Sequence, residues 1–174
     1  GESAAPTHDG QYKSLRVVGG DGPIHMTGYH HGALDEFETN PEKPGRRVEL
    51  SPALGIDAYN LNVAVLDPGD PLSQNGYHYH ESQAELFYVV EGQCRVEVED
   101  GGFTLDTDDV INFEAGVEHL LHNPFDEPCK LVAIGSPPEG RYPVQQVTPA
   151  AELLARRYGD PSPAAERIDD DTRR

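Results

Sequence analysis

Four residues in the middle of the chain have the types and the spacing of a metal site: His78, His80, Glu85 and His119. Alternate residues of a β-strand share a face, so the Cα atoms of His78 and His80 lie roughly 6.6 Å apart and both imidazoles can reach one ion. Glu85 would leave that face in an unbroken strand, but the polar residues 81–84 can turn the chain, and an antiparallel neighbour then restores the facing. His119 follows a turn and closes the set from another side.

This donor set favours one divalent transition metal per chain. Three neutral imidazoles and a carboxylate suit Fe, Mn, Ni, Cu or Zn, and the sequence does not select among them. Taken singly, each histidine is more often a surface or core residue and the glutamate a solvated one. The joint spacing of the four favours the metal.

Short segments separated by Gly, Pro and Asp turns predict the strands that must position these ligands. Apolar and polar residues alternate in most of them, which is typical of a β-sandwich or barrel. In the strand over residues 94–99, Arg95, Glu97 and Glu99 form one face that we expect to be wet. His122 has the opposite parity to His119, and we expect it to be exposed. The predicted strands cover residues 46–50, 57–66, 85–90, 94–99, 103–105, 110–113, 119–122 and 129–134.

Five further residues are candidates for the lining of a pocket beside the metal. Phe87 and Val89 share the face of Glu85 in one predicted strand. Asn60 and Asn62 lie on the smaller, more polar face of a strand covered on both sides, although an edge strand facing water is the alternative. Asn123 shares the parity of His119, and an asparagine that bonds the local backbone is an equally good interpretation.

The ligands and their flanking glycines resemble the two sequence motifs of the cupin family. The first motif is matched by His78, His80, Glu85 and Gly92, without its leading glycine. The second is matched by Gly116, His119 and Asn123, with Asp108 in place of a glycine and Glu114 in place of a proline. The resemblance covers roughly residues 46–135. It implies a jelly-roll β-barrel with a metal held by the four ligands, and the substituted positions affect turns rather than ligands.

The flanks divide the chain into three predicted parts: an N-terminal arm with short strands over residues 1–45, the barrel over 46–142, and a C-terminal helix with a flexible tail over 143–174. In the arm, Leu15, Val17 and Ile24 fall in two predicted strands joined by a glycine turn at 19–22. In the last part, Thr148 is a predicted helix N-cap, and an apolar stripe packs on the barrel. The stripe comprises Leu153, Leu154 and Tyr158.

The composition is strongly acidic, with 31 Asp and Glu against 13 Lys and Arg and a formal net charge of −18. This resembles proteins of salt-loving organisms, and an ordinary acidic cytosolic protein is the alternative. Nucleic acids and anionic membranes are excluded as partners, because both require a basic surface. No apolar run reaches the roughly 18 residues of a membrane span, and no leader is recognisable, so we expect a cytoplasmic protein. Cys94 and Cys129 are expected to be buried free thiols.

The metal site alone does not define a reaction, since this fold hosts oxygenases, isomerases, decarboxylases and binding proteins. We expect a metal-dependent enzyme of dioxygenase, isomerase or decarboxylase type that acts on a small organic acid or a related compound. One alternative is a non-catalytic module that binds or senses a small ligand through the metal. Another is a sugar-modifying jelly roll that does not use the metal. No general base is recognisable, and exposed sheet edges together with the resemblance predict a homodimer.

Overall fold

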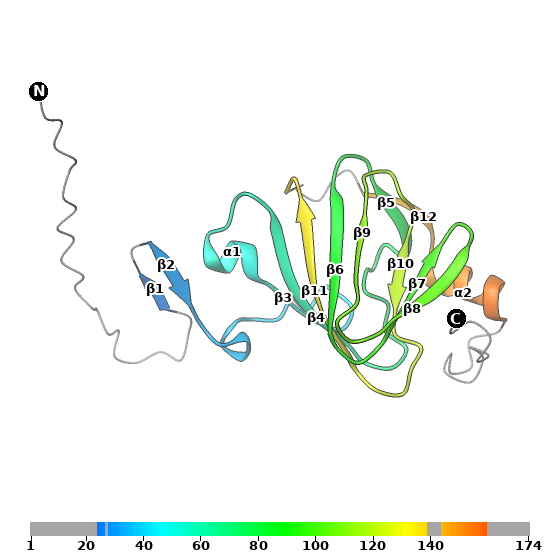
Figure 1. Ribbon diagram of the computed structural model, residues 1–174, viewed down its shortest axis with the longest axis horizontal. Helices are drawn as coiled ribbons and strands as arrows, with labels where there is room; N and C mark the ends of the chain where they lie inside the picture. The colour runs from blue at the N-terminus through cyan, green and yellow to red at the C-terminus, as the bar shows by residue number, and fades with distance from the viewer. Residues whose placement is uncertain (1–23, 27, 139–143, 160–174) are drawn as a thin grey trace, which may run out of the picture.

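The protein, in a computed structural model that describes residues 24–26, 28–138 and 144–159, is built from two facing β-layers (Figure 1). One layer is a five-stranded antiparallel sheet in the order β3-β4-β11-β6-β9. Its strands are β3 (Arg46–Glu49), β4 (Asn60–Leu66), β11 (Cys129–Ser136), β6 (Ala84–Glu91) and β9 (Val110–Phe113). The predicted all-β jelly roll is therefore confirmed, and its short C-terminal helix is present.

The second layer consists of a two-stranded and a three-stranded sheet, ordered β12-β5 and β10-β7-β8. Its strands are β12 (Val144–Thr148), β5 (Tyr77–His80), β10 (Leu120–His122), β7 (Cys94–Val98) and β8 (Gly101–Leu105). A single antiparallel bridge between His78 and His119 joins the two sheets. That junction is therefore built from two of the predicted metal ligands.

The space between the layers is filled by the apolar face of each strand. Alternation places Phe87 and Val89 of β6 on this face, opposite Val96 of β7 and Leu121 of β10. The same core buries the two free thiols, Cys94 and Cys129, as predicted. The burial of these side chains drives the two sheets together.

The described N-terminal part contains a short β-hairpin. β1 (Ile24–Met26) pairs with β2 (Tyr29–His31) in antiparallel register. The predicted glycine turn at residues 19–22 lies outside the described residues. Leu15 and Val17 lie outside the described residues. The hairpin stands away from the barrel in Figure 1, and the short helix η1 (Leu34–Glu36) follows it.

A short helix, α1 (Leu50–Leu54), was not predicted between β3 and β4. The buried Ser51 hydroxyl donates to the carbonyl of Tyr59 and accepts from the N–H of Leu61, each at 2.7 Å, which fixes the helix to the start of β4. Gly55 ends the helix with a φ of +66°, a left-handed conformation that glycine adopts without strain.

The C-terminal part begins with a strand that the sequence did not reveal, because β12 pairs with β5 beside both His78 and His80. Helix α2 (Ala150–Tyr158) follows, and its N-cap is Pro149 rather than Thr148, which ends the strand. Leu153 packs with Tyr77 and Leu120, with Leu154 against them, so the predicted contact of the helix with the barrel is confirmed. None of the helices in the described part of the chain is long and apolar enough to cross a membrane.

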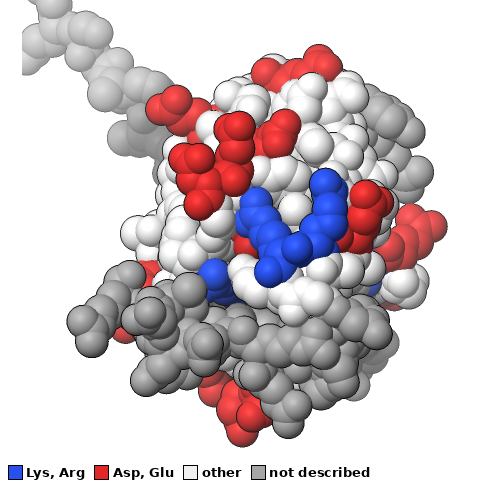
Figure 2. Space-filling view, turned by 90° about the vertical axis from the view of Figure 1, so that its right-hand side faces the viewer, with Lys and Arg blue, Asp and Glu red and all other residues white. Residues whose placement is uncertain are grey.

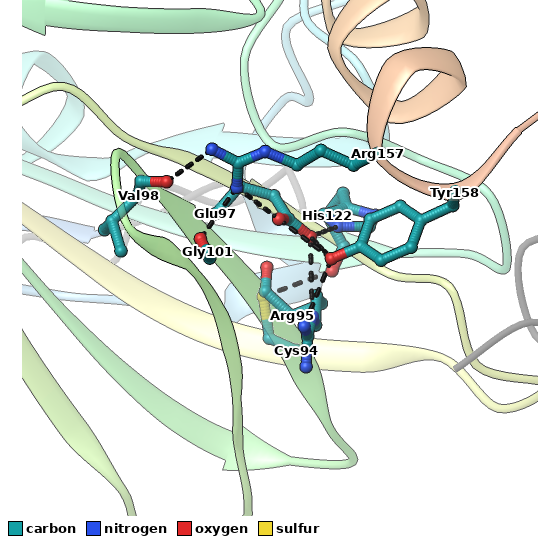
Figure 3. A network of polar contacts seen from close by, with 8 residues as sticks. All are labelled: Cys94, Arg95, Glu97, Val98, Gly101, His122, Arg157 and Tyr158. Atoms are coloured by element: carbon teal, nitrogen blue, oxygen red, sulfur yellow. Dashed lines mark hydrogen bonds and ion pairs between the residues drawn. The ribbon is translucent and has the colours of Figure 1, made fainter. Parts of the chain in front are cut away.

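The helix covers a polar cluster that the sequence analysis placed in water. Arg95, Glu97 and His122 are 2%, 0% and 3% exposed, so the predictions of a wet face on β7 and of an exposed His122 were wrong. Figure 3 shows the Glu97 carboxylate among the side chains of this cluster, with Arg157 and Tyr158 reaching it from α2. Strand alternation gives the face on which these residues lie, but it does not say that a helix covers that face.

Glu97 is the centre of the cluster. Its carboxylate accepts from Arg157 Nη1 at 2.7 Å, from Tyr158 Oη at 2.9 Å and from His122 Nε2 at 2.9 Å. Burial alone would raise the pKa of Glu97, but hydrogen bonds from His122, Arg157 and Tyr158 outweigh burial and hold that pKa below its ordinary value of 4.5. On the side of the molecule that carries α2, Lys and Arg side chains gather amid acidic ones (Figure 2).

We expect Glu97→Gln to lower the free energy of unfolding at pH 7, and Glu97→Ala to lower it by about 3–5 kcal/mol because it leaves buried guanidinium groups without their charge partner. A depressed folded-state pKa stabilises the fold above about pH 4.5, and this contribution is lost as the pH falls through the folded-state pKa. The difference between wild type and Glu97→Gln, measured by urea unfolding, should therefore shrink below pH 4.5. Glu99→Gln, an exposed change on the same chain segment, is the control, and a difference that does not vary with pH would contradict this role.

Candidate metal centre

The backbone holds two of the four predicted ligands side by side. The N–H of His78 donates to the carbonyl of His119 at 3.1 Å, and the N–H of His119 donates back to that of His78 at 2.9 Å. Residues paired in this way project their side chains to the same face, so the two rings meet, with centroids 4.9 Å apart. Gly76, before β5, has a φ of +65°, and a Cβ there would lie 2.5 Å from the N atom of Ala150.

His80 and Glu85 complete the set across the two layers. His80 lies two residues after His78 on β5, with the same facing. The turn at residues 81–83 then carries the chain into the opposite sheet, where β6 pairs with β11 and β9 rather than with β5. We expected an antiparallel neighbour of the histidine strand to turn Glu85 toward the histidines. This is corrected, since Glu85 meets the histidines from the other wall of the barrel.

The side chains converge closely enough to bind one ion. The ligand atoms of His78, His80 and Glu85 all lie within 4.8 Å of one another. His119 joins this group through Glu85, whose Oε2 is 3.0 Å from His119 Nε2 and 3.0 Å from His80 Nε2. The His80 and Glu85 side chains are 10% and 19% exposed and that of His119 only 3%, so the site opens to solvent on the His80 and Glu85 side.

The hydrogen bonds of the rings fit a metal. Nδ1 of His78 lies 2.7 Å from the Gly76 carbonyl and Nδ1 of His119 lies 2.9 Å from that of Val117. A carbonyl only accepts, so Nδ1 carries the proton and Nε2 of a neutral ring keeps its lone pair for a metal. Nδ1 of the half-buried His80 has no hydrogen-bond partner, and its Nε2 meets only the Glu85 carboxylate, at 3.0 Å. A carboxylate oxygen 3.0 Å from these nitrogens is stabilised either by a proton on the ring or by a cation that both groups bind.

The protonation states also suit cation binding. Burial is the main cause that lowers the pKa of His78 to about 4, and the neighbouring His119 lowers it further, so His78 is neutral at physiological pH. Burial would raise the pKa of Glu85, but hydrogen bonding from His119 and the contact with His80 hold it well below its usual range. The centre therefore presents neutral imidazole beside an ionised carboxylate, which is the form in which these groups bind metals.

Aromatic rings form the apolar wall of the centre. The Phe113 ring stacks on His119 with a centroid distance of 4.1 Å and an interplanar angle of 5°. The Phe87 ring lies 6.0 Å from both. Of the two predicted wall residues, Phe87 thus contacts the ligand region, whereas Val89 is fully buried in the core one row deeper. Phe113 was not predicted, because only the pairing of β9 with β6 places it opposite Glu85.

The asparagines predicted for the pocket have different surroundings. Asn60 shares a cross-strand row with Gly135 and Glu85, and Asn62 shares the next row with Ala133 and Phe87. Directly paired residues face the same side, so both asparagines face the barrel interior.

The prediction for Asn123 is corrected. Its Nδ2 donates to the carbonyls of Leu66 and Glu127, and its Oδ1 accepts from the N–H of Phe125. The side chain therefore holds a loop in place, which was the alternative interpretation.

Gln83 is a second residue that the sequence analysis missed. It is 5% exposed, and its Nε2 donates to the carbonyl of Pro137 at 2.9 Å. A Cβ on Gly135 would lie 2.7 Å from the Gln83 amide, so only glycine leaves room for it there. Because Gly135 pairs directly with Glu85, this amide caps the barrel beside the ligand carboxylate. The signal available in the sequence was a glutamine two residues before a candidate ligand.

The protein belongs to the cupin family. A model of that family, described as Cupin domain, matches residues 62–135, a segment that contains all four predicted ligands. The chain is also 31% identical over 106 residues to the polyketide synthase CurC of Streptomyces cyaneus, covering 60% of this chain and 67% of that protein. It is 30% identical over 102 residues to Protein SchB of Streptomyces halstedii, covering 58% and 72%.

Among solved structures, the chain resembles a sugar phosphate isomerase of the cupin superfamily from Silicibacter pomeroyi. The TM-score is 0.53 and the sequence identity is 28%, and the superposition covers 59% of this chain and 73% of that one.

We expect His119→Ala to lower metal affinity by about 100-fold or more, since even residues that only orient metal ligands contribute about 10–100-fold. The measurement is metal content per chain after dialysis, together with competition against a chromophoric chelator. His30→Ala, which removes an exposed imidazole from β2, is the control and should retain the metal. Unchanged metal content in His119→Ala would remove His119 from the ligand set.

Proposed function

We propose that this cupin is a metal-dependent enzyme that isomerises a small oxygenated compound by proton transfer next to a carbonyl group. The observation that carries the proposal is the convergence of His78, His80, Glu85 and His119 from both walls of the barrel, where Glu85 Oε2 lies 3.0 Å from Nε2 of both His80 and His119. A divalent metal bound there would polarise a substrate carbonyl or hydroxyl oxygen.

The residues around the ligands supply the other requirements of such a reaction. The rings of Phe87 and Phe113 exclude water from the His119 side. Both histidine contacts of Glu85 use Oε2, so Oε1 is the carboxylate oxygen that can accept a proton from substrate carbon. The depressed pKa keeps that carboxylate ionised at neutral pH but makes it a weak base, so a bound metal would have to supply most of the acidification of the substrate carbon. The Gln83 amide beside Gly135 is placed to orient a substrate hydroxyl.

The relatives support this class of substrate. One solved relative is named as a sugar phosphate isomerase, and one curated relative is named as a polyketide synthase. Sugar phosphates and polyketides share carbonyl and hydroxyl groups on nearby carbons, and the hydrogens next to the carbonyl are acidic. A single site with a Lewis acid and a nearby base acts on either kind of compound.

The test is solvent hydrogen exchange in D₂O, followed by NMR, for phosphorylated aldoses and ketoses and for simple β-diketones. We expect metal-loaded protein to catalyse exchange or isomer formation, and metal-free protein or His80→Ala to lose it. Oxygen uptake with one of these substrates would instead support a dioxygenase. Tight binding without exchange or uptake would support a non-catalytic binding module.

We also propose that a second copy of the chain covers the outer face of the five-stranded sheet. One cross-strand row on that face is apolar on every strand: Val48, Val63, Val132, Tyr88 and Val110. The next row contains Arg46, Val65, Lys130 and Glu91, and Arg46 forms an ion pair with Asp67. In a chain with a net charge of −18, an apolar row beside two cations and the acidic residues paired with them is a nearly neutral surface, on which two copies can meet without strong repulsion.

A dimer is therefore expected, with a mass about twice the 19.0 kDa of the chain in light scattering. Val110→Asp, at a position 57% exposed, should shift the mass toward the monomer because it places a charge in the apolar face. Val147→Asp, at a position 45% exposed on β12 in the other layer, is the matched control. A monomeric wild type, or a dimer unaffected by Val110→Asp, would contradict the proposal.

A further inference from the structure

An arginine that the sequence analysis passed over faces the interior of the barrel. On β3, Arg47 pairs with Ala64 of β4, which pairs with Leu131 of β11, which in turn pairs with Val89 of β6. All members of such a row face the same side, and for these residues it is the core side. The neighbours of Arg47 in sequence, Arg46 and Val48, line an apolar groove on the outer face instead.

The donors of Arg47 are incompletely paired. Its Nη2 donates to the carbonyl of Leu72, whereas its Nε is buried and has no hydrogen-bond partner. Within the described part of the chain, no carboxylate forms an ion pair with it, and the nearby Glu49 accepts from Asn40 Nδ2 at 3.1 Å. A buried donor without an acceptor destabilises the fold, so this edge of the guanidinium gains from an added acceptor.

Arg47 is also electrostatically linked to the metal centre. Burial lowers the pKa of its guanidinium, and the negative charges of Glu85 and Glu49 oppose that change. Strand pairing places both side chains on the same face of the sheet, since Arg47 lies in the row of Val89 and Glu85 shares the face of Val89 on β6. A buried arginine remains charged at neutral pH. Its planar guanidinium can donate two parallel hydrogen bonds to the oxygens of a carboxylate or phosphate.

We propose that Arg47 binds the anionic group of the substrate, a carboxylate or a phosphate, while the oxygenated end of the same molecule reaches the ligand residues. This inference rests on the proposed function in that it names a substrate class for the same site. It assigns acidic sugars, sugar phosphates or small organic acids, and it disfavours neutral compounds. The contact with Leu72 alone would make Arg47 only a structural link, and the experiment separates these two roles.

The test measures anion binding to Zn²⁺-loaded full-length protein by isothermal titration calorimetry, with inorganic phosphate and with succinate as probes. Arg47→Met should raise the Kd of at least one probe by about tenfold or more, and Arg47→Lys should raise it less because it keeps the charge but loses the fork. Arg46→Met is the matched control, since the adjacent side chain is exposed and outward and pairs with Asp67. Metal content is measured for each variant, and Kd values are compared only between samples of equal metal content. Any binding of the anion to the metal then contributes equally to all of them.

The two probes identify the anionic group, because the one with the larger loss in Arg47→Met is the better match. If Arg47→Met does not fold, the Kd values of Arg47→Lys are used instead. Wild-type affinity of Arg47→Lys for both probes then overturns the proposal. Failure of the wild type to bind either anion, or equal binding by a folded Arg47→Met, overturns it as well. Because the readout is binding rather than turnover, Arg47-dependent anion binding without hydrogen exchange would refute the isomerase proposal and leave this inference standing.

Discussion

The reciprocal backbone hydrogen bonds between His78 and His119 are the constraint on which the rest of the molecule depends. They join the β12-β5 sheet to the β10-β7-β8 sheet, and they set two imidazoles on one face of that junction. Because the same pairing closes the second layer and assembles the ligands, fold and site cannot vary independently. A change that opens this junction separates the rings and exposes two sheet edges at once.

Much of the centre could be predicted because its information is local. Strand alternation is enough to pair His78 with His80, and motif spacing is enough to add Glu85 and His119. The residues that were missed depend on pairing between segments distant in sequence. Phe113 reaches the site through the pairing of β9 with β6, and Arg47 faces the interior through the pairing of β3 with β4.

The errors on the other layer have a related cause. Alternation correctly separated Arg95 and Glu97 from the apolar residues of β7, but it did not show what lies over them. Arg157 and Tyr158 of α2 are some 60 positions further along the chain, and they turn a face expected to be wet into a buried polar one. Asn123 shows the same limit. Strand parity predicts the direction in which its side chain points, but not that its amide already donates to backbone carbonyls.

The position of β12 has a consequence for the order in which the protein is made. The strand that carries His78 and His80 is complete early, yet one of its neighbours, β12, ends only at Thr148, and α2 packs against Tyr77 after that. During synthesis, the strand with His78 and His80 therefore emerges with an open edge, which stays open until β12 has been made. The strand that carries His78 and His80 therefore has both of its neighbours only once this late segment has been made, and a site for a metal would be complete only then.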